Sequence, residues 1–468
     1  MLLRNPIRVA LGILGGLLCS AAFAQTLPSF PGAEGFGARA TGGRGGSVLK
    51  VNTLAASGPG SLQWAIDQPG PRIVVFTVSG VINGDIEIGH GDLTIAGQTA
   101  PGAGITIAGH LYTPFPTSFG NLVIRHLRVR PPMPDSNWPP QQHDAVQFSA
   151  NQLLMLDHVD FSHSVDEILD LYDGARDISV QWSNLSFSVY GGGHPDGAGH
   201  NFGMLNGPNG GRISVHHNLF AHNRARSPAI SYGPAEVINN VVYNAREGFV
   251  HHNPAVGQFN LIGNTYKDGP SGTLIPMFFD PENEPPPSAY HVGGNRVIDP
   301  GVFEGIVDNP FTTPGFGDAY GFYCCGIEPM MFANASPFPY GGYAGRVAVT
   351  VQNVDLAYAE VLAKAGAWPR DRISQWSVEE AANRTGSWGN RRPSNWMEGL
   401  TAGTAPLDSD GDAMPDSWEL GRGLNPNSAA DVHQVLAGGY PAVETWINEM
   451  ADALIGAAAA SLFLDGFE

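Results

Sequence analysis

A short pattern recurs through the middle of the chain: an apolar residue, one or two residues of any kind, His or Asn, and usually another apolar residue. It is centred on His126, His158, Asn184, Asn218, Asn240, Asn264 and Asn295. The successive intervals are 32, 26, 34, 22, 24 and 31 residues. A base period of 22 to 26 residues with inserted loops is typical of a solenoid whose coil contains three short strands. Asparagine tolerates left-handed backbone angles, so copies of it at one corner would stack into a ladder along the solenoid axis.

Two other all-β folds, the β-sandwich and the propeller, compete with the solenoid. Sandwich strands alternate polar and apolar residues over longer runs than those seen here. The apolar stretches 73–82, 93–97 and 105–109 are short and would form the first coils. A helical pattern appears only late, at 355–367. These observations favour a parallel β-helix with long loops.

The composition narrows the class of protein further. The 61 Gly and 37 Pro among 468 residues, with 43% hydrophobic residues, exclude a coiled coil, a bundle of long helices and a disordered acidic chain. A formal net charge of −19 argues against a partner such as nucleic acid or an anionic membrane surface. The chain has only three lysines, Lys50, Lys267 and Lys364. Any cationic site therefore has to be built mainly from arginine, histidine or a bound cation.

The first 24 residues have the pattern of an export signal of the bacterial Sec type. Arg4 and Arg8 precede an apolar run over 9–18, and the small-x-small sequence at 22–24 is typical of signal-peptidase cleavage. The run is too short for a membrane span, which needs about 20 residues. We therefore expect a secreted or periplasmic protein that begins at Gln25 and has no membrane attachment after cleavage.

The mature chain is expected to contain one large domain and a small appendage. The β-helix would occupy 25–395, a calcium-loop segment with a helix 396–456, and a tail 457–468. Cys324 and Cys325 are adjacent, so they cannot link distant segments, and the fold has to be stable without a disulfide framework. Aromatic residues over 268–345 would either line a sugar-binding groove or cap the solenoid.

Several motifs, in one order along 30–395, resemble the pectate lyases of polysaccharide lyase family 1. They are FPGAEGFGARATGGRGG (30–46), SGPGSL (57–62), PRIVVFTVSGVI (71–82), LTIAGQTAPGAGI (93–105), LDHVDFSHSVDEILD (156–170), HHNLFAHNRARSP (216–228) and VLAKAGAWPRDR (361–372). The resemblance implies a right-handed parallel β-helix. It also implies an enzyme that cleaves polygalacturonate by calcium-assisted β-elimination.

Three aspartates have a spacing that suits a calcium site. Elimination removes a proton next to a carboxylate, so the charge of that carboxylate has to be neutralised. A calcium ion held by protein carboxylates can supply the neutralising positive charge, because calcium prefers oxygen ligands. Asp166 and Asp170 would share one face of a strand, and Asp144 precedes them by one coil. These three residues match the calcium carboxylates of the family, although a further aspartate of the family is replaced by Gln142. The alternative is that Asp166 and Glu167 are solvated loop residues.

Arg226 matches the catalytic base of the family. It follows Asn218 by eight residues, as Asp166 follows His158, and the same offset on the coil between them falls on Gly192. The base would then face the calcium site from two coils away, about 10 Å. Because a guanidinium is normally charged, we expect activity that rises with pH to an alkaline optimum. The alternative for Arg226 is a structural ion pair.

Two departures from the family affect substrate binding. Ser231 stands where the family has a second arginine, and no lysine occurs between 51 and 266. The candidates for replacing these cations are Arg224, His200, His217 and Arg176. Substrate binding is therefore the part of the site that the resemblance specifies least.

The segment DSDGDAMPDSWE contains a second candidate calcium site. The residues at positions 1, 3, 5, 9 and 12 of a calcium loop are Asp408, Asp410, Asp412, Asp416 and Glu419. The glycine expected at position 6 is Ala413. The segment resembles the aspartate-rich calcium repeats of dockerins, and we expect a structural calcium clip rather than docking to a cohesin. A helix is predicted over 439–454.

The leading interpretation is a secreted, monomeric pectate lyase that uses Ca²⁺ and acts on de-esterified polygalacturonate. A non-catalytic β-helix that binds polysaccharide is the first alternative, because of Ser231 and the missing lysine. A polygalacturonase-type hydrolase is the second alternative. Its Gly-His-Gly motif occurs only at 89–91, without the Asn-Thr-Asp and Asp-Asp motifs that should accompany it.

Overall fold

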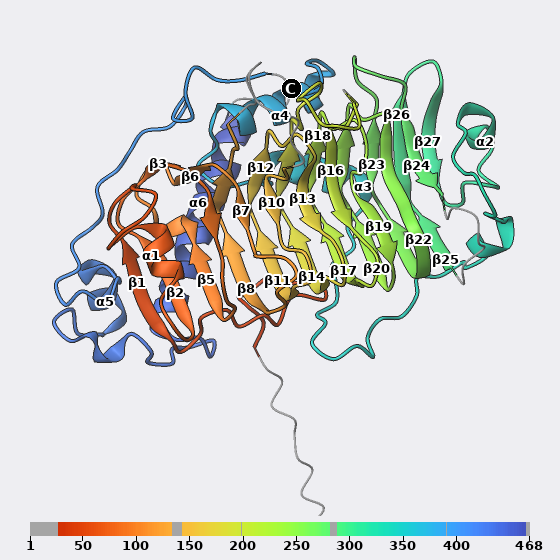
Figure 1. The fold of residues 1–468 in the computed structure, drawn as a ribbon. Helices are drawn as coiled ribbons and strands as arrows, with labels where there is room; N and C mark the ends of the chain where they lie inside the picture. The colour runs from red at the N-terminus through yellow and green to blue at the C-terminus, as the bar shows by residue number, and fades with distance from the viewer. Residues whose placement is uncertain (1–26, 133–142, 198, 281–287, 390, 465–468) are drawn as a thin grey trace, which may run out of the picture.

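Short parallel strands stack in successive coils over most of the chain (Figure 1). The structure is a computed structural model, which describes residues 27–132, 143–197, 199–280, 288–389 and 391–464. The export signal expected at 1–24 and Gln142 lie outside the described residues. Among the residues described, no helix is both long and apolar enough to cross a bilayer.

Each coil contributes a strand to each of three faces. The first face contains β1 (Ser47–Val51), β2 (Arg72–Phe76), β5 (Leu93–Ala96), β8 (Gly120–Arg125), β11 (Gln152–Asp157), β14 (Arg176–Gln181), β17 (Gly211–His216), β20 (Ala235–Ile238) and β25 (Ser288–Gly293). The second face contains β3 (Gly80–Asn83), β6 (Ile105–Ala108), β9 (Leu127–Val129), β12 (Asp160–Ser162), β15 (Asn184–Ser186), β18 (Leu219–Ala221), β21 (Val241–Tyr243), β23 (Thr265–Lys267), β26 (Asn295–Asp299) and β27 (Phe303–Val307). The third face contains β4 (Ile86–Glu87), β7 (Leu111–Tyr112), β10 (Val146–Gln147), β13 (Glu167–Leu171), β16 (Phe202–Asn206), β19 (Ala229–Tyr232) and β24 (Ile275–Phe279).

The pairing of these strands confirms the predicted right-handed parallel β-helix. The long strand β22 (Glu247–Ile262) pairs with β19 and β24 on the third face and then with β20 and β25 on the first. Only the last pair of the second face, β26 with β27, is antiparallel among the pairings described. The apolar stretches expected to form the first coils become β2, β3, β5 and β6.

The turn from the first face to the second contains the predicted asparagine ladder. The side-chain oxygens of Asn240, Asn264 and Asn295 each accept a hydrogen bond from the backbone N–H of the preceding member, Asn218, Asn240 and Asn264, at 3.0 Å. All four side chains are buried. Each rung therefore satisfies a backbone donor that the sharp corner removes from the strand pairing.

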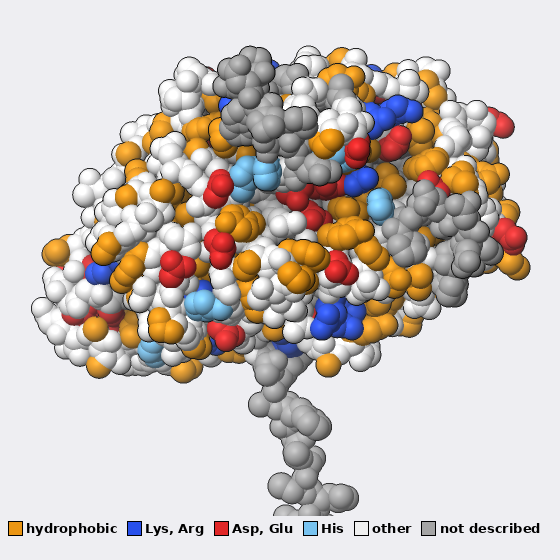
Figure 2. Space-filling view, viewed as in Figure 1, with side chains coloured by type: hydrophobic (Ala, Val, Ile, Leu, Met, Phe, Trp, Pro, Cys, Tyr) orange, Lys and Arg blue, Asp and Glu red, His pale blue; other side chains and the backbone are white. Residues whose placement is uncertain are grey.

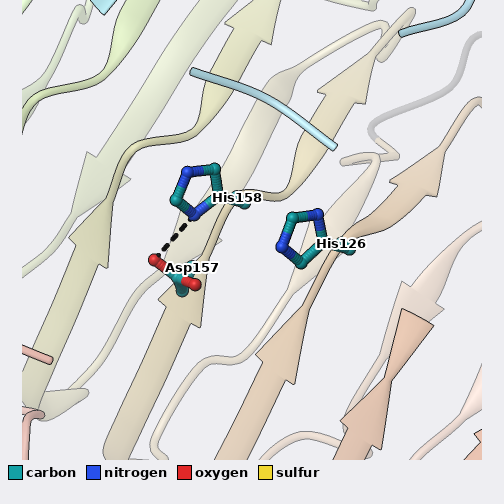
Figure 3. A group of neighbouring side chains, drawn as sticks. All are labelled: His126, Asp157 and His158. Carbon is teal, nitrogen blue, oxygen red and sulfur yellow. Dashed lines mark hydrogen bonds and ion pairs between the residues drawn. The ribbon is translucent and has the colours of Figure 1, made fainter. Parts of the chain in front are cut away.

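A second stack occupies the position just before this ladder. His126, His158, Trp182 and His217 all have left-handed φ angles between 49° and 56°. The ring centroids lie 5.0 Å apart for His126 and His158 and 4.5 Å apart for Trp182 and His217. In Figure 3 the His126 and His158 rings lie side by side, and His158 Nδ1 contacts Asp157 at 3.0 Å. The assignment of His126 and His158 to the asparagine ladder was therefore wrong by one residue, because their rings stack with Trp182 instead. The assignment of Asn184 was also wrong by one residue, because Ser183 holds the ladder position and donates its N–H to Asn218 Oδ1, whereas Asn184 is in register with Leu219.

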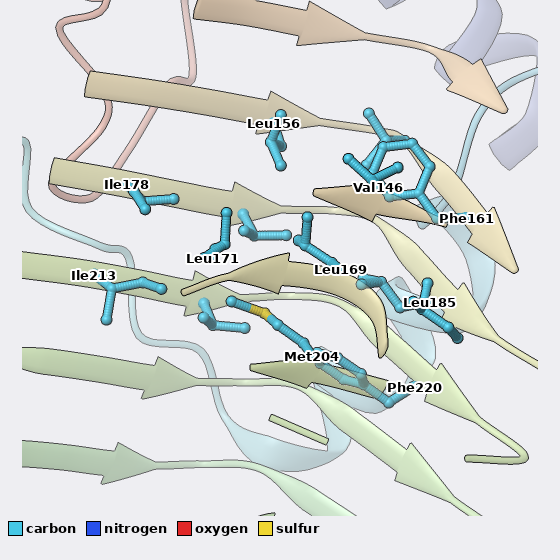
Figure 4. Close-up of a cluster of buried hydrophobic side chains, with 14 of the residues drawn as sticks. Val146, Leu156, Phe161, Leu169, Leu171, Ile178, Leu185, Met204, Ile213 and Phe220 are labelled. Atoms are coloured by element: carbon cyan, nitrogen blue, oxygen red, sulfur yellow. The ribbon is translucent and has the colours of Figure 1, made fainter. Parts of the chain in front are cut away.

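The interior of the coils is filled by apolar side chains from all three faces. Leu156 on the first face, Phe161 on the second and Leu169 on the third are fully buried in one cluster (Figure 4). Burying a side chain of this size contributes about 1.5–3 kcal/mol. At the far end of the solenoid, Phe316 and Tyr320 join the same cluster. These two aromatic residues cap the core rather than line a groove.

The helices lie outside the coils or at their ends. They are α1 (Leu62–Ile66), η1 (Gly97–Thr99), α2 (Phe316–Ala319), η2 (Pro329–Phe332), α3 (Val354–Lys364), α4 (Arg372–Asn383), α5 (Asp416–Arg422), η3 (Ala429–Asp431) and α6 (Ala442–Leu464). The helices predicted at 355–367 and 439–454 are α3 and α6. The N-cap of α4, Asp371, accepts from Ser374 N–H and forms a buried ion pair with Arg130 at 3.0 Å. This pair holds α4 against the second face.

The C-terminal segment returns to the coils with which the β-helix begins. Figure 1 shows α5 beside β1. Met414, Val443 and Trp446 pack against Ile73 and Val75 of β2 in one buried cluster. α6 continues past residue 456, so the expected boundary between appendage and tail falls inside one helix. The thiols of Cys324 and Cys325 are both free.

Candidate active site

Carboxylates from two neighbouring strands meet at the start of the third face. β10 pairs with β13, with Gln147 opposite Asp170. Asp144 precedes β10, and one of its oxygens accepts from Glu167 N–H at 3.0 Å. One carboxylate oxygen from each of Asp144, Asp166 and Glu167 lies within 4.8 Å of the other two. Figure 2 shows acidic side chains in a hollow near the middle of this face, beside basic and histidine side chains.

Asp170 adds a fourth carboxyl group to this cluster. Its Oδ2 accepts from Ser149 Oγ at 3.1 Å, whereas its Oδ1 is buried and has no hydrogen-bond partner among the described residues. Burial raises the pKa of Asp170 to about 7. Burial, followed by the charge of Asp170, also raises the pKa of Asp144 well above its ordinary value. Raised pKa values of neighbouring carboxyl groups indicate that the positive charge around them is too small to balance all of them in ionised form.

Two histidines contact the remaining carboxylate, Asp166. His200 Nε2 lies 2.8 Å from one oxygen and His194 Nε2 lies 3.3 Å from the other. The two imidazole rings stack with centroids 3.6 Å apart. Burial alone would raise the pKa of Asp166, but the hydrogen bond from His200 and the nearby histidines lower it to about 2. His200, predicted to bind substrate, contacts a candidate calcium ligand.

Arg226 lies in the turn before β19 and reaches back to the cluster. Ala225 pairs with Phe202, which in turn pairs with Glu167, so the arginine is two strands away from β13, as expected. Its Nη1 donates to Glu167 Oε1, and its guanidinium lies over the Phe202 ring, 4.0 Å from the centroid. Burial raises the pKa of Glu167 well above its ordinary value, and the charge of Arg226 opposes this rise. The ion pair considered as an alternative for Arg226 is thus present.

The coil between β13 and the arginine differs from the expected register. The residue level with Arg226 is Gly203 of β16, because Gly203 N–H donates to Ala225 C=O and Met204 N–H donates to Arg226 C=O. Gly192 lies in the loop before β16, where a Cβ would approach Val165 Cγ1 to 2.7 Å. Gly192 therefore leaves room for packing with Val165 and does not open a gap between calcium site and base.

The other predicted substrate-binding residues separate into two groups. Arg224 lies in the same turn as Arg226, donates to Gly199 C=O at 2.9 Å and lines the same pocket of about 220 Å³. His217 and Arg176 lie at other corners: His217 is buried in the stack on Trp182, and Arg176 donates to Gln152 at the start of the first face. His217 and Arg176 are close to the motifs in the sequence, but they lie at other corners of the coil than the carboxyl cluster.

The arrangement suits a hard divalent cation. The carboxyl groups of Asp144, Asp166, Glu167 and Asp170 supply oxygen donors, and calcium prefers oxygen ligands with loose geometry. The unpartnered Oδ1 of Asp170 is directly available to such an ion. The donor set therefore fits calcium and places a guanidinium beside it.

Sequence reasoning missed two residues of the site. Glu167 was expected to be either unused or solvated, but it is buried between Asp144 and Arg226. The signal for Glu167 was its position directly after Asp166 at the start of a strand. His194 comes from a long loop between β15 and β16, and no repeat position indicated where that loop would fold.

Comparison with known proteins places the chain in a family. No protein-family model matches it. A protein named "Probable pectate lyase C" from Aspergillus flavus is 30% identical, over 92% of this chain and 95% of the relative. The protein of the same name from Neosartorya fischeri is 32% identical, over 93% and 97%. The solved structure of the cedar pollen allergen jun a 1 aligns with a TM-score of 0.48 and 17% identity, over 72% of this chain and 92% of the allergen. On the strength of relatives at least 30% identical across nearly their whole length, the chain belongs to the pectate lyase family.

Proposed function

We propose that this chain is a secreted enzyme that cleaves de-esterified polygalacturonate by calcium-assisted β-elimination and releases 4,5-unsaturated oligogalacturonides. Membership of the pectate lyase family supports this activity. The observation that carries the proposal is the meeting of a buried carboxyl cluster and one guanidinium on the third face. Asp144, Asp166 and Asp170 are the proposed calcium ligands, and Arg226 is the proposed base.

The reaction needs a base beside a neutralised uronate carboxylate. When bound, calcium would offset the negative charge that develops next to that carboxylate. Arg226 in its uncharged form accepts the C5 proton, the C5–H electron pair forms the C4–C5 double bond, and the C4–O glycosidic bond breaks. The leaving oxygen then takes up a proton. Arg224 lines the pocket around Arg226 and is the proposed contact for a substrate carboxylate.

Glu167 determines how readily Arg226 can act. Its carboxyl group contacts the guanidinium and also lies within 4.8 Å of the ligating oxygens of Asp144 and Asp166. The same oxygens can therefore serve either the guanidinium or the cation site. While Glu167 holds Arg226, this guanidinium nitrogen is engaged by the carboxyl group and has to leave it before it can take up a substrate proton.

The test replaces Arg226 and measures turnover separately from calcium binding. Arg226→Lys and Arg226→Ala are assayed by the ultraviolet absorbance of the unsaturated product, and calcium affinity is measured by calorimetry. We expect turnover to fall by about 10²–10⁴-fold without a loss of calcium affinity. Arg212→Ala is the matched control, because Arg212 pairs with Asp177 on the first face and its loss should leave turnover unaffected.

Two outcomes would contradict the proposal. Full turnover in Arg226→Ala would exclude the arginine as base. Wild-type protein that binds polygalacturonate in calcium but yields no unsaturated product would instead favour the non-catalytic alternative, which Ser231 supports. Reducing ends formed without absorbance would indicate a hydrolase.

A further inference from the structure

The loop that begins at Asp408 contains buried carboxyl oxygens without partners. Ligating oxygens of Asp408, Asp410 and Asp412 lie within 4.8 Å of one another. Glu419, in α5, is fully buried, and neither of its oxygens has a hydrogen-bond partner among the described residues. One oxygen of Asp410 and one of Asp412 are also buried and unpartnered within the described chain. Burying unpaired carboxylates is costly, so this arrangement calls for a positive charge.

A further carboxylate enters this group from outside the loop motif. Asp431 ends the turn η3, twelve residues after Glu419. Its Oδ2 accepts from Asn425 N–H at 2.9 Å, while its Oδ1 is buried and has no partner in the described part of the chain. Asp431 is thus, with Asp410, Asp412 and Glu419, a fourth residue of this segment with a buried carboxyl oxygen that has no hydrogen-bond partner among the described residues.

Two acids of the motif already have other partners. Both oxygens of Asp416 accept from Ser409, one from its N–H and one from its hydroxyl, each at 2.7 Å. Asp408 forms an ion pair with Lys50 of β1 at 2.9 Å and accepts from Ala413 N–H. The residues with unpartnered oxygens therefore differ from the predicted calcium ligands. Asp408 and Asp416 stabilise the loop through their own hydrogen bonds, and Asp431 is an additional residue with an unpartnered oxygen.

We propose that Asp410, Asp412, Glu419 and Asp431 hold a calcium ion that locks the C-terminal segment onto the first coils. Calcium is the expected cation because every donor is a carboxyl oxygen and four acids meet. The loop is attached to the β-helix on both sides of this site. Lys50 binds Asp408, and Met414, which follows the loop's turn, is buried against Ile73 and Val75.

The backbone at the sixth position of the loop agrees with a calcium-binding turn. Ala413 has φ 87°, although a side chain disfavours this left-handed region. The loop thus keeps the turn for which the motif normally uses glycine. A bound cation would help to hold this strained turn, because its ligands lie on both sides of Ala413.

The experiment compares calcium binding and thermal unfolding of the full-length protein in calcium and in chelator. In Glu419→Gln and in Asp431→Asn we expect one fewer bound calcium per chain than in the wild type, and loss of the rise in Tm that calcium gives. In chelator, Glu419→Gln should melt at a higher temperature than the wild type, because a buried unpaired carboxylate has been removed. Asp452→Asn, on an exposed position of α6, is the matched control and should behave like the wild type.

The active-site calcium is separated from this site by a second comparison. Asp170→Asn should lose turnover but keep the calcium-dependent rise in Tm, whereas Asp431→Asn should show the reverse at saturating calcium. Unchanged stoichiometry and an unchanged rise in Tm in both Glu419→Gln and Asp431→Asn would overturn the proposal. If Glu419→Gln does not fold, Asp431→Asn alone decides, since it changes a surface turn.

Discussion

Acidification should destabilise this protein through histidines that the fold keeps neutral. Six of them are buried at corners or between coils, and burial lowers the pKa of each: His126, His163, His216, His217, His222 and His251. The pKa values of His163, His222 and His251 fall to about 3 and that of His217 to about 4. In the unfolded chain a histidine titrates near 6.5. Between these values only the unfolded chain takes up protons.

The size of the effect follows from proton linkage. Because the folded-state pKa is depressed, the stability that each histidine contributes is complete above pH 6.5 and is lost as the pH falls below that value. From about pH 7.5 to about pH 5.5, each group costs about 1.4 kcal/mol, and six cost up to about 8 kcal/mol. That is comparable with the total stability of many proteins, about 5–15 kcal/mol. Saturating calcium is needed, because Asp144, Glu167 and Asp170 have raised pKa values and would oppose the trend by binding protons.

The assay is urea unfolding at the two pH values, followed by tryptophan fluorescence and circular dichroism. His126→Asn should reduce the pH-dependent loss by about 1.4 kcal/mol, since Asn239 has the same left-handed corner conformation. His433→Asn, at an exposed position, is the control and should leave the loss unchanged. A total loss below about 2 kcal/mol, or no effect of His126→Asn, would refute the reasoning.

Three further predictions concern the ladder, the core and the base. Asn240→Ala removes the acceptor of Asn218 N–H and the donor to Val215 C=O, and should lower the free energy of unfolding by about 2–5 kcal/mol in urea titrations; Asn240→Ser should cost less. Phe161→Ala leaves a cavity between the faces and should cost about 3–5 kcal/mol by the same titration, whereas a cost below about 1 kcal/mol would mean that the coils collapse around it. Turnover on polygalacturonate at saturating calcium should rise from pH 7 to pH 9 as the uncharged guanidinium becomes more abundant, and a maximum near pH 5 would contradict Arg226 as base.

The repeat could be predicted because a coil's corner has strict backbone requirements. Asn218 and Asn240 occupy a position where few residues can both turn the chain and satisfy its N–H groups, so their spacing reports the coil directly. The cluster of Asp144, Asp166 and Asp170 could be anticipated for a similar reason, since strand register fixes which residues are neighbours. Contacts made by irregular segments could not be anticipated in this way. The approach of His194 to Asp166 depends on the shape of an inserted loop.

Contacts between segments that are far apart in the sequence are the second kind that the sequence pattern does not predict. Asp431 has no repeat position and no motif spacing that would place it near Glu419, yet its charge is among the causes that raise the pKa of that residue. The pairing of Asp371 with Arg130 likewise joins residues 241 positions apart. Such contacts depend on where a segment packs after the coils have formed, which local propensity does not encode.

The return of the C-terminal segment has a consequence for how the molecule is completed. Arg44 and Glu444 form an ion pair across a separation of 400 residues, next to the apolar strip of β2 that α6 covers. A polypeptide made from its N-terminus cannot cover this strip until residues 442–447 have left the ribosome. The first coils therefore complete their packing last. A product of premature termination would expose the apolar side chains of β2, which favours aggregation with other nascent chains.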